Sequence, residues 1–216
     1  MQMKISMTLL FALFFSSLRA QQKGVYIYRE IEPAEWVIPR NDTLDYSLGS
    51  YQGQNALFMK RKLANYKSAS VAYPKGLMFR DGIIEADIAW TGKQNGFIGL
   101  AFRVTDEHHY EVVYLRPESS GTINAIQYMP EKKAEFNWWD YEADKYQANA
   151  ILPLHDWIHL KLVVKRSSVS VFVNGQTKPA MVYPALDGSL TAGSAGYWLG
   201  NSEAGAYRNL KVTVWQ

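Results

Sequence analysis

The chain contains no cysteine among its 216 residues. This absence excludes disulfide bonds, thiol catalysis, zinc sites built from cysteine, and a lipid anchor on an N-terminal cysteine. The protein must therefore be stabilised by its apolar core. That core can be large, because 48% of the residues are hydrophobic and 14% are aromatic, which is sufficient for one sizeable domain.

Long apolar runs are also missing. The run Met7–Phe15 is followed at once by two serines and an arginine, whereas a membrane-spanning helix needs about 20 apolar residues. Lys4 before this run and Ala20 after it give the pattern of a cleaved signal peptide. We therefore expect a leader at residues 1–20, one domain at residues 21–216 that is periplasmic or extracellular, and no stable insertion into a membrane.

Net charge is small. Two of the 23 basic residues lie in the leader, so 21 remain against 20 acidic residues, a charge of about +1. This balance provides no electrostatic attraction for nucleic acid, and it fits a neutral ligand better than a polyanion. A local basic patch is still compatible with it.

Helical periodicity is absent as well. Only Glu135–Ala150 allows a short helix or an ordered loop, whereas alternating runs typical of β-strands recur between turn residues. The expected strands are residues 55–62, 82–90, 96–103, 110–116, 122–129, 157–166, 168–175, 195–200 and 207–215. Many short strands of this kind predict an all-β sandwich or barrel of antiparallel strands.

The clearest local unit is the hairpin at residues 157–175. Apolar residues alternate with lysines and serines along most of both arms. Asn174 and Gly175 then supply the positive φ that a tight turn requires.

Three stretches of the chain resemble the laminin-G-like, concanavalin-A-type jelly-roll proteins that bacteria export. They are Phe79–Pro117, which contains GIIEADIAW, GFIGLAFR and YEVVYLRP, then residues 156–175, and then residues 192–212. The same order of strands is similar to that of the 3-keto-disaccharide hydrolase domain family. The resemblance implies a jelly-roll sandwich of two curved antiparallel sheets, whose concave sheet offers a groove for a saccharide chain. It does not specify an activity, because this fold is shared by lectins, glycosidases and inert spacers.

The stretch GFIGLAFR places small residues on one face of a strand. Alternation puts Gly99, Ala101 and Arg103 on the same face, and a glycine weakens a strand unless something approaches its backbone closely. In the resembling fold the two small residues would keep a groove floor low, with Arg103 at its edge donating to sugar hydroxyls or a carboxylate. The alternative is that they only make room for a loop or for the second sheet.

The next expected strand adds Tyr114 and Arg116 to this face if its aliphatic residues point inward. Arginines on adjacent strands repel unless an acid or an anionic ligand lies between them. The arrangement therefore predicts a counter-charge such as Glu111 near Arg103, or a bound carboxylate. For Arg116 the alternative is an ordinary ion pair at the end of a strand.

Residues 119–141 mix amides with aromatic side chains. Asn124 and Gln127 can read hydroxyl groups, and the flat faces of Trp138 and Trp139 can stack on pyranose rings. The alternative is that one tryptophan is in the core and the other anchors a loop. The expected ligand-binding residues are thus Arg103, Tyr114, Arg116, Asn124, Gln127, Trp138 and Trp139.

A glycosidase mechanism has weaker support in the residues. Glycosidases of the concanavalin-A type commonly carry three acids on one strand, but here Trp90 replaces the third acid after Glu85 and Asp87. We expect these two acids to be solvated partners of lysines. If the hydrolase resemblance extends to activity, the catalytic candidates are Glu107, His108, His109 and Glu111, near the groove edge.

The histidines do not have the spacing of a metal site, since adjacent histidines in a turn point apart. No phosphate loop, dinucleotide fingerprint or nucleophile elbow occurs either, so no cofactor is expected. Calcium on loop oxygens is common in the resembling fold, with Asp144, Asp187 and Gly188 as the candidates, although no run of Asp and Asn with ligand spacing is present.

Three hypotheses remain. The first is an exported carbohydrate-binding module, the second a hydrolase of the 3-keto-disaccharide type that cleaves glycosidic bonds, and the third a non-catalytic domain that contacts a protein through its aromatic loop. Acids or histidines converging in the groove would favour the enzyme, an aromatic and amide surface the binder, and a flat, filled face the third. The sequence leaves the sugar and the oligomeric state open.

Overall fold

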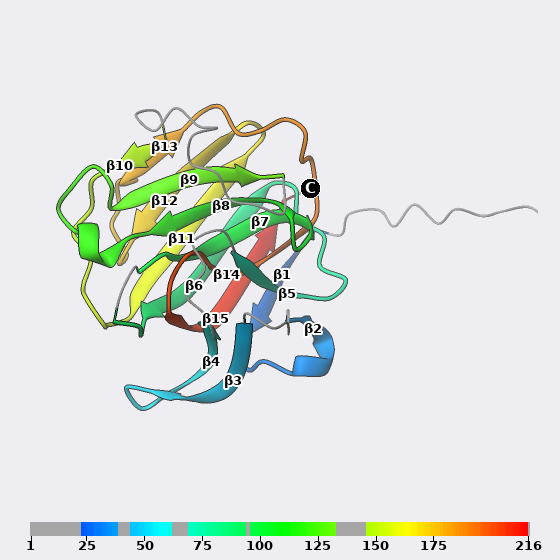
Figure 1. Ribbon diagram of the computed structural model, residues 1–216. Coiled ribbons are helices and arrows are strands. Elements are labelled where there is room, and N and C mark those ends of the chain that lie inside the picture. The colour runs from blue at the N-terminus through cyan, green and yellow to red at the C-terminus, as the bar shows by residue number, and fades with distance from the viewer. Residues whose placement is uncertain (1–22, 39–43, 62–68, 94–95, 133–145, 216) are drawn as a thin grey trace, which may run out of the picture.

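The computed structural model describes residues 23–38, 44–61, 69–93, 96–132 and 146–215. These residues form two antiparallel sheets, and the strands of one sheet cross behind those of the other (Figure 1). The helices within these ranges are two short 3₁₀ helices, η1 (Pro33–Glu35) and η2 (Pro117–Ser119), and neither could cross a membrane. The expected all-β sandwich of antiparallel strands is confirmed. The leader expected at residues 1–20 lies outside the described residues.

The first sheet has the strand order β13-β12-β11-β6-β15-β4-β3, and β1 also pairs with β15. Its strands are β1 (Gly24–Tyr28), β3 (Leu44–Tyr51), β4 (Gln54–Arg61), β6 (Gly82–Trp90), β11 (Ile158–Lys165), β12 (Ser168–Val173), β13 (Met181–Tyr183) and β15 (Ala204–Val214). One edge of β15 has two partners, because residues 204–207 pair with β4 and residues 210–214 pair with β1. The exchange coincides with a β-bulge, where the register against β6 shifts and Asn209 adopts a φ of 56°.

The second sheet has the order β10-β9-β8-β7-β14-β5-β2. Its strands are β2 (Trp36–Val37), β5 (Ser70–Pro74), β7 (Ile98–Asp106), β8 (His109–Leu115), β9 (Ile126–Glu131), β10 (Gln147–Ala148) and β14 (Ser194–Leu199). Several strands that follow one another in sequence, such as β5 and β6, β6 and β7, or β13 and β14, belong to different sheets. The chain therefore crosses repeatedly between the two layers, as in a jelly roll.

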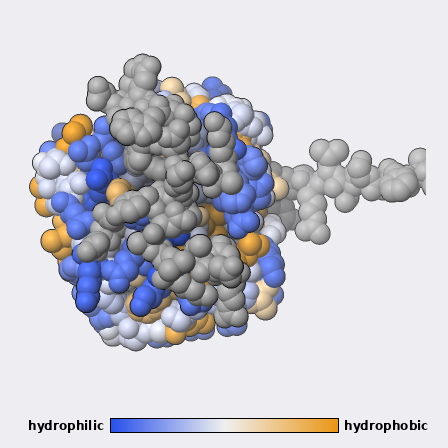
Figure 2. Space-filling model, in the orientation of Figure 1, coloured by the Kyte–Doolittle hydropathy of each residue, from blue (hydrophilic) through white to orange (hydrophobic). Residues whose placement is uncertain are grey.

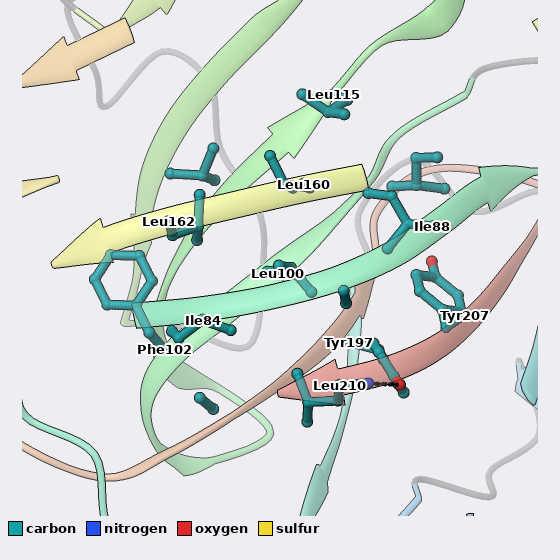
Figure 3. Packing of buried hydrophobic residues seen from close by; sticks show 14 of the residues in the cluster. Ile84, Ile88, Leu100, Phe102, Leu115, Leu160, Leu162, Tyr197, Tyr207 and Leu210 are labelled. Atoms are coloured by element: carbon teal, nitrogen blue, oxygen red, sulfur yellow. Dashed lines mark hydrogen bonds between the residues drawn. The ribbon is translucent and has the colours of Figure 1, made fainter. Parts of the chain in front are cut away.

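The main core lies between the sheets, because alternation turns one apolar face of each strand inward. Ile84 and Leu160 from the first sheet, and Leu100 and Leu115 from the second, have no exposed surface; Figure 3 shows these side chains between the ribbons. Burial of a side chain of this size contributes about 1.5–3 kcal/mol. Val113 belongs to the same cluster, so the inward orientation expected for the aliphatic residues of β8 is confirmed.

A second apolar cluster lies on the outer face of the second sheet. Its buried members are Val71, Ala101, Val104, Tyr110, Val112, Tyr114, Met129 and Trp198. Gly99 lies between Tyr114 and Trp198 in the strand register, and the centres of those two rings are 5.0 Å apart. A Cβ atom on Gly99 would be only 2.7 Å from the Cβ of Tyr114. The close approach that a strand glycine implies is thus made by a neighbouring aromatic residue.

The hairpin expected at residues 157–175 is formed by β11 and β12, and Asn174 and Gly175 have positive φ as predicted. The strand expected at residues 122–129 begins only at Ile126, because the Ala125 amide closes a turn by donating to the Thr122 carbonyl. The helix or loop expected at residues 135–150 lies mostly outside the described residues, and its last part contributes β10.

The outer face of the first sheet carries ion pairs. Glu85 lies 3.0 Å from Lys211 and 3.8 Å from Lys161, so the lysine partners expected for this acid are confirmed. The same expectation is wrong for Asp87, which accepts hydrogen bonds from His159, Arg208 and Asn209 at 2.9, 3.1 and 2.8 Å.

Candidate functional site

A β-bulge near the end of β7 decides where Arg103 points. β7 pairs regularly with β8 as far as Phe102, and the register then shifts before Asp106. Arg103 adopts a φ of 52°, in the left-handed region that side chains other than glycine rarely occupy. The expectation that Arg103 shares the face of Gly99 and Ala101 is therefore wrong, because the bulge directs its side chain toward the first sheet.

Four hydrogen bonds hold the buried Arg103 guanidinium. Its Nη1 donates to Oε1 of Glu111 at 2.8 Å, and its Nε donates to the Arg80 carbonyl at 3.1 Å. Its Nη2 donates to the Arg166 carbonyl at 2.6 Å and more weakly to Oδ1 of Asp81 at 3.4 Å. A guanidinium has five N–H groups, so the protein itself uses most of them. The counter-charge predicted for Arg103 is confirmed as Glu111.

Glu111 anchors this network from the second sheet. The Tyr128 hydroxyl donates to its Oε2 at 2.5 Å, and the Asp187 backbone N–H donates to the same oxygen at 3.1 Å. Burial raises the pKa of Glu111, while the Tyr128 hydrogen bond and the Arg103 charge work in the opposite direction. Burial, followed by the Glu111 charge, raises the pKa of Tyr128, so this hydroxyl keeps its proton and remains a donor.

A cleft of about 420 Å³ lies beside the network. Its walls come from four places: the turn before β6, the end of β7, the β11–β12 turn and the segment between β13 and β14. The lining residues are Arg80, Asp81, Arg103, Arg166, Ser167, Leu186, Asp187, Gly188, Leu190 and Thr191. Guanidinium groups, hydroxyls, carboxylates and two leucines are a combination suited to recognising a polar ligand.

The two acids that line the cleft already have partners. Oδ1 of Asp81 accepts the Arg166 backbone N–H at 2.7 Å. Asp187 forms an ion pair with Lys132 and accepts the Ser189 backbone N–H at 2.8 Å. Partial burial works to raise the pKa of Asp187, but the bonds from Lys132 and Ser189 hold the pKa below its usual value.

These contacts do not fit the calcium site that the resemblance allows. Ca²⁺ takes six to eight oxygen ligands, whereas the Asp187 carboxylate is occupied by a lysine and an amide. No group of three His, Asp or Glu residues that could hold a metal occurs in the part of the chain that the structure describes. Asp144 lies outside the described residues.

Several expected ligand-binding residues gather elsewhere, toward the outer face of the second sheet. The Tyr114 hydroxyl donates to Gln127 at 2.8 Å, and Gln127 donates to Gln147 at 2.6 Å. The Arg116 guanidinium lies 4.9 Å from the centre of the Phe97 ring, which is a cation–π contact. The structure brings Tyr114 and Gln127 together, but it does not place them in the cleft.

The remaining expected ligand-binding residues are in loops. Asn124 is half-buried in the turn before β9, where its backbone N–H donates to the Thr122 hydroxyl at 3.2 Å. Trp138 and Trp139 lie outside the described residues. Their roles in binding stay predictions.

The four candidate catalytic residues do not form one cluster. Glu107 and His108 occupy the exposed turn between β7 and β8, and His109 begins β8 with its Nδ1 at 2.8 Å from Asp106. Glu111 instead contacts Arg103, Tyr128 and the Asp187 backbone. The described residues that are visible in Figure 2 are mainly hydrophilic or of intermediate hydropathy, with hydrophobic areas between them.

Sequence reasoning missed Arg80, Arg166, Ser167 and Thr191 as cleft residues. The sequence carried no signal for Arg80 and Arg166, because they come together through the antiparallel pairing of β11 with β6, which places the end of β11 at the start of β6. That pairing brings the turn at Arg166 next to Asp81. Thr191 had no signal either, since it lies in an irregular segment.

The fold is shared with solved structures of three kinds. The carbohydrate binding module CBM66 from Bacillus subtilis matches 83% of this chain and 96% of its own, with a TM-score of 0.58 and 12% identity. A legume lectin-like domain from Entamoeba histolytica matches over 88% and 96%, with a TM-score of 0.55 and 12% identity. A candidate glycosyl hydrolase from Parabacteroides distasonis matches over 85% and 90%, with a TM-score of 0.52 and 11% identity.

The chain therefore has a concanavalin-A-like sandwich fold, as the resemblance implied. No protein-family model matches the sequence, and no curated protein matches it. Identities this low establish the fold and leave function to be argued from the site.

Proposed function

We propose that this protein is a non-catalytic carbohydrate-binding module whose ligand occupies the cleft beside Arg103. The observation that carries the proposal is the fixed polar floor of the cleft, where one buried guanidinium holds the backbones of both Arg80 and Arg166. Sugar hydroxyls are recognised by donors and acceptors in set positions, and a site arranged before binding loses little conformational entropy. The fold it shares with a carbohydrate binding module and a lectin-like domain supports the same proposal.

Different lining residues would contact the polar and the apolar parts of the ligand. Arg80, Arg166, Ser167 and Thr191 would bond to oxygen atoms of the ligand, because their side chains offer guanidinium and hydroxyl groups. The small exposed parts of Leu186 and Leu190, whose side chains are otherwise buried, would contact the C–H face of a sugar ring. Arg103 would act mainly by holding the two flanking arginines in position.

The proposal is tested by affinity electrophoresis of the purified protein through gels that contain a panel of neutral and acidic polysaccharides. At least one polymer should retard the wild-type protein. A hydrogen bond to a charged group contributes about 1.5–3 kcal/mol, so Arg166→Ala should weaken this retardation about tenfold or more. Arg29→Ala is the matched control, since Arg29 is an exposed arginine that does not line this cleft.

Two results would contradict the proposal. Equal retardation of the Arg166→Ala and Arg29→Ala variants would remove the cleft from the binding site. Release of reducing sugar that increases with time in the same samples would show catalysis. The candidate catalytic residues would then be Glu107, His108, His109 and Glu111.

A further inference from the structure

Two arginines that line the cleft have no acidic partner. Arg80 and Arg166 are exposed, and in the described ranges no carboxylate lies within ion-pair distance of either guanidinium. Arg166 does contact Asp81, but through its backbone N–H, which leaves its guanidinium free of that acid. Both side chains can therefore donate to a ligand.

Each acid near these arginines already has a cationic partner, although two of the acids share one. Glu111 is paired with Arg103 at 2.8 Å, and Asp187 with Lys132. Asp81 lies 3.4 Å from the same Arg103 guanidinium. The cleft and its supporting network thus contain four cations, Arg80, Arg103, Arg166 and Lys132, against three anions, Asp81, Glu111 and Asp187. The net excess is one positive charge, because Arg103 is shared by Glu111 and Asp81, while Arg80 and Arg166 have no acidic partner among the described residues.

The positions of these arginines favour one shared anionic group. Their carbonyl oxygens bond to the same guanidinium, at 3.1 Å for Arg80 and 2.6 Å for Arg166. The two residues are therefore neighbours in space, although 86 positions separate them in the sequence. Guanidinium groups bind a carboxylate through two parallel hydrogen bonds, and they lose less hydration than an ammonium group does.

We propose that the ligand is an acidic saccharide whose carboxylate binds between Arg80 and Arg166. This inference rests on the proposed function and names the ligand class of the same cleft. It assigns charge recognition to these two arginines, while Ser167 and Thr191 remain available for hydroxyl groups. The nearly neutral chain as a whole does not oppose such a ligand, because the unpaired positive charge is local to the cleft.

The test compares polygalacturonate and alginate with the same two polymers after their carboxylates have been chemically reduced to alcohols. A sulfated galactan and an uncharged galactan complete the panel. We expect the intact protein to be retarded by at least one polyuronate, and its apparent Kd to rise about tenfold or more when that polymer is reduced. Arg80→Gln and Arg166→Gln should each cause a loss of similar size, and Arg29→Gln should cause little change.

The outcomes separate this inference from the proposed function. Equally tight binding to a polyuronate and to its reduced form, or to a neutral polymer alone, would overturn the acidic ligand and leave carbohydrate binding intact. Binding to the sulfated galactan but to neither polyuronate would overturn the assignment of a carboxylate. Equal weakening by Arg29→Gln would show non-specific charge attraction and overturn the inference, and no binding to any polymer would overturn both proposals.

Discussion

At the scale of single residues, Arg103 has the widest structural effect, because its guanidinium joins the two sheets. It pairs with the charged Glu111 in the second sheet and donates hydrogen bonds to two carbonyl groups in the turns of the first. Both members of the pair are buried, with side chains 5% and 0% exposed. Removing one member leaves a charge in the interior without compensation.

We therefore expect Arg103→Met to lower the free energy of unfolding by about 3–5 kcal/mol, the usual cost of breaking a buried ion pair. Urea denaturation measures this difference. The double variant Arg103→Met, Glu111→Gln should recover part of the loss, because an uncharged amide is cheaper to bury than an unpaired carboxylate. The interpretation fails if the single variant is as stable as the wild type, or if the double variant is no more stable than the single one.

The second prediction at this scale concerns the packing around Gly99. A methyl group there would lie 2.4 Å from the Val113 carbonyl oxygen and 2.7 Å from the Cβ of Tyr114, so the two strands would have to separate. Overpacking of this kind costs about 1–3 kcal/mol, and thermal unfolding of Gly99→Ala should show a lowered Tm. Gly188→Ala is the control, because a Cβ at Gly188 meets nothing within 4 Å. A Tm reduced equally in both variants would refute the explanation from packing.

At the scale of elements, the outer faces of β6, β11 and β15 are linked by hydrogen bonds to Asp87. His159 on β11 and Arg208 on β15 both reach this carboxylate, at 2.9 and 3.1 Å. The hydrogen bond to Asp87 is the main cause that raises the pKa of His159, although partial burial opposes it. The pKa of Asp87 is lowered, because its hydrogen bonds and charged partners outweigh the effect of burial.

This arrangement makes stability depend on pH. A raised pKa in the folded state means that the His159 contribution is fully present below its ordinary pKa, about 6.5, and is lost as pH rises through the raised value. The loss of stability on His159→Gln should therefore be larger at about pH 5.5 than at about pH 8.5. Denaturation at both pH values measures it, and the pH dependence should become smaller in an Asp87→Asn background, where only Glu85, 3.9 Å from His159, still raises its pKa. A difference that grows toward alkaline pH would be incompatible with this sign.

The strands predicted best from the sequence are those with one buried face. β6 was expected at residues 82–90 and has those bounds, because its apolar residues alternate with Glu85 and Asp87. β3 was missed, since Leu44–Tyr51 is an exposed edge strand with little apolar alternation. The strand β3 is held in place by its pairing with β4. The alternation within residues 44–51 gives no indication of that partner.

The candidate site was harder to predict than the fold. The ion pair between Arg103 and Glu111 followed from the repulsion expected between arginines, and the structure confirms it. The direction of Arg103 did not follow, because a left-handed φ at an arginine has no signature in the sequence. Arg80 and Arg166 are brought near the same guanidinium by the pairing of β6 with β11, which neither segment's own sequence reveals.

At the scale of the whole molecule, stability comes from an apolar core that lies between two sheets, and no disulfide bond adds to it. Neighbouring strands such as β6 and β15, or β5 and β14, are far apart in the sequence. A sandwich with so many non-local pairings is expected to fold slowly.

The strand β15 connects the two halves of the first sheet. It lies between β6 on one side and both β4 and β1 on the other, yet it is the last of the described strands to be synthesised. Until it emerges, the N-terminal strands β1, β3 and β4 have no connection to the rest of their sheet. The first sheet consequently remains divided into separate groups of strands until its final strand is available, even though the strands of the second sheet have all been synthesised by then.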